Sequence, residues 1–157
     1  MKTLVISMGG TPLKRWSNEK DKMDYNDVEI FELLKDICPK AGIEHDYLDI
    51  VVICSKESDE VNYSDMVNLY RGIEIYDGLE FQFIVICGNN KMAEIANKLK
   101  KKLGDRNEKK IFFVGGNTPV QIDSVPFTAN LTTAVLFIEN ETPGVYIVTN
   151  PGEYEAV

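Results

Sequence analysis

The sequence predicts an α/β domain: a three-layer, open, mainly parallel sheet with helices on both faces. Apolar runs typical of strands alternate with helical patterns five times, without internal repeats or linkers. The strongest run, Phe81–Cys87, is continuously apolar at its centre, as expected of a parallel strand buried on both faces. Right-handed crossovers bring the carboxyl ends of such strands to one edge, where glycines and small polar residues here predict a ligand cleft.

The first half of the chain predicts two strands and two helices. Residues 2–7 form a buried strand, and the polar residues 12–24 are too long for a simple turn, which predicts a functional lid or a disordered loop. Asn26 is the expected N-cap of the first helix, which Pro39 and Gly42 end. The apolar face of this helix is predicted at helical spacing: Val28, Phe31, Leu34, Ile37 and Cys38.

A second strand is expected over residues 47–54, followed by a polar loop at 55–60. Asn62 is the predicted cap of the second helix, with Asp65 in its first turn. Asp77-Gly78 marks the turn that leads out of this helix.

The second half predicts three strands and two helices. The strands are 81–87, 110–114 and 145–149; a helix follows each of the first two, and no element is expected after residue 149. The lysines near residues 98–102 match the negative end of a helix dipole, which is a simpler explanation than a basic binding patch.

The composition suits one cytoplasmic domain over residues 1–157. The chain has 44% hydrophobic and 27% charged residues, and its net charge of -8 disfavours nucleic acid as a partner. No apolar run approaches the ~20 residues that a membrane span needs, and no signal-peptide layout is seen. Three cysteines without a C-x-x-C motif predict reduced, buried thiols. With one histidine, His45, expected on the surface, neither a metal nor a cofactor is predicted.

Short motifs at the strand ends are the candidate site. The nucleotide fingerprints G-x-x-x-x-G-K-[ST] and G-x-G-x-x-G are absent, as is the hydrolase elbow G-x-S-x-G. In Gly9-Gly10-Thr11, two glycines let a ligand approach the backbone, and the hydroxyl is a candidate nucleophile or ligand contact; a tight turn is the alternative. The segment Gly88-Asn89-Asn90-Lys91 opens a helix, so it predicts either an anion site or simple capping.

The succession of these strand ends resembles the N-terminal domain of the bacterial L-asparaginase/glutaminase family. The family begins with T-G-G-T-I, which residues 8–12 match, and residues 57–58, 76–78, 87–92 and 114–119 match later family motifs in order. The resemblance implies that Thr11 is the nucleophile, that Tyr25 is the catalytic tyrosine of the mobile loop, and that a substrate amino acid lies at the sheet edge. The substrate-binding residues implied are Gly10, Ser58, Gly88, Asn89, Asn90 and Asn117.

Two departures from the family pattern bear on activity. The second threonine and the aspartate of the family motif are Asn89 and Asn90 here, and an amide cannot take up a proton as a carboxylate does. Lys91 is a substitute base toward Thr11 only if desolvation lowers its pKa. The family's smaller C-terminal domain, which completes the site of a neighbouring subunit, is not expected in this chain.

Two functions follow from these features. The first is an asparaginase-like domain that binds a small amino acid or amide, with hydrolysis to aspartate or glutamate and ammonia by a threonine nucleophile as its enzymatic form. The second is a non-catalytic protein that uses the scaffold for homo-oligomerisation or to bind a partner, since apolar surface covered by a further domain in the family must be exposed, repacked or buried in an oligomer.

Overall fold

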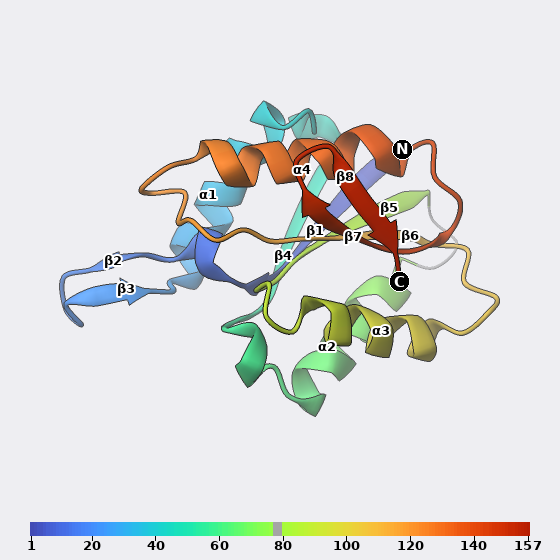
Figure 1. The fold of residues 1–157 in the computed structure, drawn as a ribbon, viewed down its shortest axis with the longest axis horizontal. Helices are drawn as coiled ribbons and strands as arrows, with labels where there is room; N and C mark the ends of the chain where they lie inside the picture. The colour runs from blue at the N-terminus through green and yellow to red at the C-terminus, as the bar shows by residue number, and fades with distance from the viewer. Residues whose placement is uncertain (77–79) are drawn as a thin grey trace.

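A computed structural model describes residues 1–76 and 80–157 and has the predicted three layers (Figure 1). The central sheet has six strands, and a separate two-stranded hairpin leaves it near the N-terminus. The strands are β1 (Lys2–Gly9), β2 (Arg15–Ser17), β3 (Lys22–Asp24), β4 (Leu48–Lys56), β5 (Phe81–Ile86), β6 (Lys110–Val114), β7 (Gly144–Asn150) and β8 (Glu153–Ala156). The helices are α1 (Asp27–Lys40), α2 (Tyr63–Glu74), α3 (Met92–Leu103) and α4 (Val125–Ile138), with short 3-10 helices at Thr11–Leu13, His45–Tyr47 and Ser58–Glu60.

The strand order of the central sheet is β4-β1-β5-β6-β7-β8. Strands β4 to β7 run parallel to β1, and β1 lies between β4 and β5, with Ser7 opposite both Val52 and Ile86. The direction in which the sheet grows reverses between β1 and β5, which makes their carboxyl ends the topological switch point where ligands bind in open α/β sheets. Helices α1 and α4 cover one face of the sheet and α2 and α3 the other (Figure 1).

Residues 12–24, for which a functional lid or a disordered loop was predicted, contain the ordered hairpin β2–β3. Asp21 has φ 51 in the connecting turn, and the hairpin projects away from the body of the domain (Figure 1). Its base is tied down, because the backbone N–H of Trp16 donates to the Gln121 Oε1 at 2.7 Å. Three-residue strands with charged side chains give too short a pattern to be recognised in the sequence.

Strand β8 is an antiparallel edge strand that the sequence analysis did not predict. It pairs with β7, and the Tyr154 ring lies 5.2 Å from Phe112 and 4.8 Å from Phe137 between ring centroids. One inward tyrosine in four residues is too weak a pattern to predict a strand. In the structure, β8 nevertheless pairs with the otherwise open edge of β7.

The buried face of α1 differs from the predicted one at its N-terminal end. Asn26 caps the helix as predicted, accepting a hydrogen bond from the Glu29 N–H at 3.1 Å. The face turned toward the sheet carries Ile30 at 1% exposure, whereas Val28 is 74% exposed and Phe31 40% exposed. The C-terminal part of the predicted face is confirmed, because Leu34, Ile37 and Cys38 are buried. In the first turns Ile30 takes the inward position, since it continues the stripe of Leu34 and Ile37 at helical spacing.

Truncation of Ile30 and of Val28 tests which side of α1 faces the sheet. We expect Ile30→Ala to lower the free energy of unfolding by about 2–4 kcal/mol, because it leaves a cavity under α1. Val28→Ala is the matched control and is expected to change it by less than about 0.5 kcal/mol, since its side chain is exposed. Urea denaturation measures both, and equal losses would contradict the observed helix face.

The remaining fold predictions have mixed outcomes. Asp65 completes the predicted cap of α2, and His45 is exposed. Pro39 lies inside α1, one residue before its end, instead of terminating it. The cysteines are free, but Cys54 is only partly buried; burial raises the pKa of the Cys38 and Cys87 thiols to about 12. The predicted turn at Asp77-Gly78 lies outside the described residues.

None of the helices in residues 1–76 and 80–157 is long and apolar enough to span a bilayer.

Candidate functional site

Three strand ends meet without space for intervening side chains. Gly10, after β1, has φ 102, and a Cβ there would lie 2.9 Å from the carbonyl carbon of Cys87 and the nitrogen of Gly88. A Cβ at Gly88, after β5, would in turn lie 3.1 Å from the Ser58 nitrogen and Oγ. Gly10 therefore needs both glycine's freedom at positive φ and its small size. The glycines draw the ends of β1, β4 and β5 together at the switch point.

Tyr25 closes one side of this junction. Its hydroxyl accepts a hydrogen bond from the Gly10 N–H at 3.1 Å. Burial, reinforced by the Glu57 carboxylate, raises the pKa of Tyr25, so the phenol stays neutral at physiological pH. Lys14 forms an ion pair with Glu57, and its Nζ lies 5.5 Å from the centroid of the Tyr25 ring. Tyr25 is thus fixed beside the Gly10–Thr11 turn as a neutral hydrogen-bonding group.

Ser58 closes the other side. It is buried, and its Oγ accepts a hydrogen bond from the Lys91 N–H at 3.0 Å, just before α3 begins. The serine hydroxyl retains its own proton for donation. Ser58 therefore links the end of β4 to the start of α3.

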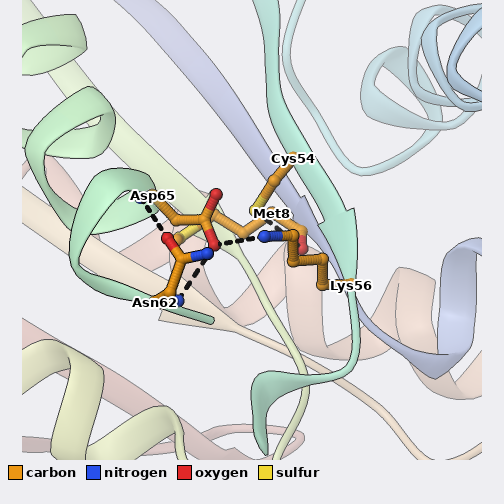
Figure 2. Close-up of polar contacts among 5 residues, drawn as sticks. All are labelled: Met8, Cys54, Lys56, Asn62 and Asp65. Atoms are coloured by element: carbon orange, nitrogen blue, oxygen red, sulfur yellow. Dashed lines mark hydrogen bonds and ion pairs between the residues drawn. The ribbon is translucent and has the colours of Figure 1, made fainter. Parts of the chain in front are cut away.

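A polar cluster around the buried Asp65 carboxylate holds the Ser58 segment in place (Figure 2). Lys56 Nζ donates to Asp65 Oδ2 at 2.8 Å, and Asp65 also completes a reciprocal capping box with Asn62 at the start of α2. Burial raises the pKa of the Asp65 carboxyl, but the hydrogen bonds from Lys56 and from the Asn62 N–H outweigh it and hold the net pKa below its usual range. The cluster ties both ends of the short segment between β4 and α2.

A cleft of about 530 Å³ opens beside the junction, at the ends of β6 and β7. Asn89 Nδ2 donates to Asn117 Oδ1 at 2.8 Å across one wall. Helix α3 begins there at Met92, and its N-cap residue Lys91 makes no side-chain cap hydrogen bond. The Lys91 N–H is bonded to Ser58 Oγ and the Met92 N–H to the Asn89 carbonyl, and the next N–H groups of the first turn have no partner within the helix. The lining residues are Asn89, Met92, Ala93, Gly116, Asn117, Thr118, Pro126, Asn130, Ile147, Val148, Thr149, Asn150, Pro151 and Glu155.

The structure brings most of the predicted site residues to this edge. Around the junction, Gly10 lies against both Tyr25 and Gly88, and Gly88 lies against Ser58. Thr11 is partly buried next to Gly10. The predicted binding residues Asn89 and Asn117 line the adjoining cleft.

The predicted site residues Asn90 and Lys91 differ from these because their side chains are exposed to solvent. Asn90 is exposed, and the Lys91 side chain is 52% exposed, with its Nζ 3.7 Å from Glu94 Oε2. The desolvation that a basic Lys91 would need is therefore missing. It is the Lys91 backbone N–H that contributes to the junction.

Sequence reasoning missed the far wall of the cleft. Asn130 Nδ2 donates to the Gly115 carbonyl at 2.9 Å, while its buried Oδ1 has no partner among the described residues. Glu155 comes from the unpredicted β8. Of the residues on this wall, only Asn150 could be placed near the site from the sequence, because it follows the predicted strand 145–149 and strand ends were expected to line the cleft. The described residues contain no group of three or more His, Cys, Asp or Glu side chains arranged to hold a metal ion.

Comparison with known proteins gives the family. The profile of the family described as Asparaginase, N-terminal matches residues 2–156. The thermostable L-asparaginase from Thermococcus kodakarensis superimposes with a TM-score of 0.75 at 18% identity, covering 100% of this chain and 51% of that one. The probable cytoplasmic L-asparaginase from Campylobacter jejuni gives 0.71 at 18% identity, covering 94% and 45%. No curated protein sequence matches the chain significantly.

The chain thus spans about half the length of these two asparaginases. Sequence identity this low shows a common fold and no more. The fold agrees with the predicted parallel sheet, and the family profile agrees with the resemblance in the strand-end motifs. Since that profile covers residues 2–156, the chain belongs to the asparaginase family and has the fold of its N-terminal domain.

Proposed function

We propose that this chain binds a small amino acid or carboxamide in the cleft at the strand ends, and that it does not hydrolyse the amide at an enzymatic rate. The observation that carries the binding proposal is the uncapped start of α3 beside a cleft lined by asparagines. The N-terminus of a helix favours a carboxylate through its free N–H groups and its dipole. Side-chain amides supply the donors and acceptors that match a carboxamide.

The arrangement gives each end of such a ligand a partner. The ligand carboxylate lies at the start of α3, near Met92 and Ala93, and its amide lies beside Asn117. Glu155, which also lines the cleft, supplies a negative charge for the ligand's ammonium group. A free amino acid with an amide side chain satisfies all three.

Efficient hydrolysis is not expected, because neither residue considered as a base for Thr11 is suited to that role. Asn90 is an amide and is exposed, and Lys91 is solvated and paired with Glu94. Tyr25 has a raised pKa and is a neutral phenol, which donates a proton rather than accepting one. A threonine hydroxyl without a base is a weak nucleophile.

The binding proposal is tested by truncating a cleft amide. Asn117→Ala is expected to weaken binding of L-asparagine about 10-fold, which corresponds to ~1.4 kcal/mol for one lost hydrogen-bonding group. An NMR chemical-shift titration of the full chain measures this affinity. Asn97→Ala is the matched control, because that exposed α3 amide bonds to the Ala93 carbonyl and is not among the cleft residues. Equal affinities for both variants would place the ligand elsewhere.

The proposed lack of hydrolysis is tested separately, by measuring ammonia release from L-asparagine and L-glutamine. We expect no release above the uncatalysed background. Release that Thr11→Ala abolishes would overturn the non-catalytic assignment and establish Thr11 as the nucleophile.

A second candidate function is a non-catalytic scaffold that acts through self-association or a protein partner. It is favoured by the apolar side chains exposed on α4, among them Val125 at 69% and Leu136 at 64%. A chain that assembles but binds none of the amino acids tested would support this candidate over the first.

A further inference from the structure

A groove of about 710 Å³ runs between α2 and α3, on the side of the sheet opposite α1 and α4 (Figure 1). It shares no lining residue with the cleft at the ends of β6 and β7. Along α3 its lining extends from Lys91 to Lys102. At 1.5 Å per residue these two positions lie about 16 Å apart, which is the length of three helical turns.

One wall of the groove is an apolar stripe of α2. Tyr63, Val67 and Tyr70 contribute to it, and their positions follow one another at helical spacing. They flank Leu69 and Ile73, which are fully buried in the core beneath the sheet. Helix α2 therefore has a second apolar side that the sheet covers only in part, and Tyr63 on this side is 83% exposed.

Helix α3 supplies the floor of the groove and a charged edge. Ile95 and Leu99 line the groove and are buried. Lys91, Lys98 and Lys102 also line it, at positions that recur on the same side of the helix. Their ammonium groups thus border an apolar channel.

This edge is positive although the chain as a whole is acidic. The chain has a net charge of -8, whereas α3 carries four lysines and one glutamate. The glutamate, Glu94, offsets the first part of the edge, since its carboxylate lies 3.7 Å from Lys91 Nζ and 3.2 Å from Lys98 Nζ. Lys102 instead lies over the Tyr70 ring, with 5.3 Å between Nζ and the ring centroid. A cation–π contact holds Lys102 on the apolar wall while its positive charge is retained.

The α2 edge adds little net charge. Arg71 and Glu74 both line the groove there and offset each other, and Asp59 lies beside Ser58 at the end where α3 begins. The positive charge is therefore concentrated toward the C-terminal half of α3. An occupant of the groove needs an apolar side for the floor and negative charge for this edge.

We propose that the groove binds an acidic amphipathic α-helix of a partner protein. The apolar side of that helix packs on Ile95, Leu99 and Tyr70, and its carboxylates face Lys98 and Lys102. Amphipathic helices commonly bind in this way, with apolar residues three and four positions apart inserted into a groove. The length of about 16 Å matches three turns of such a helix.

The shape of the groove disfavours two other anionic occupants. A small molecule with a single acidic group leaves most of the length of the groove unfilled. A flat anionic membrane meets the lysines but not the floor formed by the buried Ile95 and Leu99. The inference does not depend on any ligand in the cleft, because the two sets of lining residues are separate.

Fluorescence anisotropy of a labelled peptide, titrated with the full chain, tests the proposal. The probe is a synthetic helical peptide of about 14 residues with leucines on one side and glutamates on the other. Its counterpart has lysine in place of every glutamate. We expect the glutamate peptide to bind saturably at about 0.15 M salt and the lysine peptide to bind at least ~10-fold more weakly.

Two neighbouring lysines of α3 provide matched variants. Lys102→Glu reverses a charge at the edge of the groove and is expected to weaken binding of the glutamate peptide at least ~10-fold. Lys101→Glu makes the same change in net charge one residue away, outside the groove, and is expected to change the affinity less than ~2-fold. Circular dichroism establishes that both variants keep the fold.

The apolar wall is tested in the same assay. Tyr63→Ala is expected to weaken binding of the glutamate peptide at least ~3-fold, because it removes an exposed aromatic ring from the wall. Tyr47→Ala is the matched control, since that tyrosine is 49% exposed and lies outside the groove. We expect it to leave the affinity unchanged.

Three results would overturn the proposal. The first is an absence of binding by the glutamate peptide. The second is equal weakening by Lys102→Glu and Lys101→Glu, which indicates attraction to the net charge alone. The third is cosedimentation of the full chain with phosphatidylserine vesicles that both lysine variants reduce equally, which would assign the basic edge to a membrane surface.

Discussion

Gly10→Ala is expected to lower the free energy of unfolding by about 2–4 kcal/mol, combining a strained backbone with a steric clash. The backbone at Gly10 has φ 102, and the added Cβ would meet main-chain atoms of Cys87 and Gly88 at 2.9 Å. Main-chain atoms of β5 cannot rotate away as a side chain can, so the ends of β1 and β5 must separate. Urea denaturation of the full chain measures the loss.

Gly104→Ala separates the two contributions. Gly104 also has positive φ, at 77, but a Cβ there would have nothing within 4 Å. We therefore expect this control to cost only about 1 kcal/mol, the conformational part alone. If the two variants lost equal stability, close packing at the switch point would contribute nothing, and the description of the junction would be wrong.

Asp65→Ala is expected to destabilise the fold by about 1–2 kcal/mol, because it removes a helix cap and the ion pair with the partly exposed Lys56. Asp65 receives hydrogen bonds from Lys56 at 2.8 Å and from the Asn62 N–H at 3.0 Å (Figure 2). Asp36→Ala is the matched control, since its pair with Lys40 is exposed and is worth less than about 0.5 kcal/mol. Thermal unfolding of both variants distinguishes a structural cluster from a surface ion pair.

Because the pKa of Asp65 is lowered on folding, we also expect the free energy of unfolding to fall in acid. The pKa of Asp65 is lower in the folded chain than its ordinary value of 3.8, so the folded state binds fewer protons there than the unfolded state. The stabilisation is complete above that ordinary value and disappears as the pH falls through the lowered folded pKa. Wild type and Asp65→Ala should therefore converge in stability in strong acid; a constant difference at every pH would contradict the ionic contribution.

The sequence was most informative where long apolar patterns and turn chemistry agreed. The parallel strands were predictable because continuous apolar runs such as Phe83–Ile86 are buried on both faces. The capped start of α2 was predictable because Asn62 and Asp65 act locally. These features depend on neighbours in the chain, which sequence patterns describe well.

The features that were missed depend on contacts between distant segments. Strand β8 is stabilised by pairing with β7 and by the packing of the Tyr154 ring against Phe112, neither of which is visible in four residues. The inward face of α1 is set by its fit to the sheet, which selects Ile30 over Val28. Likewise, Asn89 and Asn117 were each candidates, but only the fold shows that they bond to each other and line one cleft.

We propose an asparaginase-family domain that binds an amino acid or amide without the means to hydrolyse it. Isothermal titration of L-asparagine into the full chain tests both parts at once, because binding gives a heat pulse that saturates and turnover gives a sustained heat flow. We predict saturable 1:1 binding with the baseline restored after each injection, weakened by Asn117→Ala. An absence of binding heat would contradict the proposed cleft, and sustained heat that Thr11→Ala abolishes would show an active amidohydrolase.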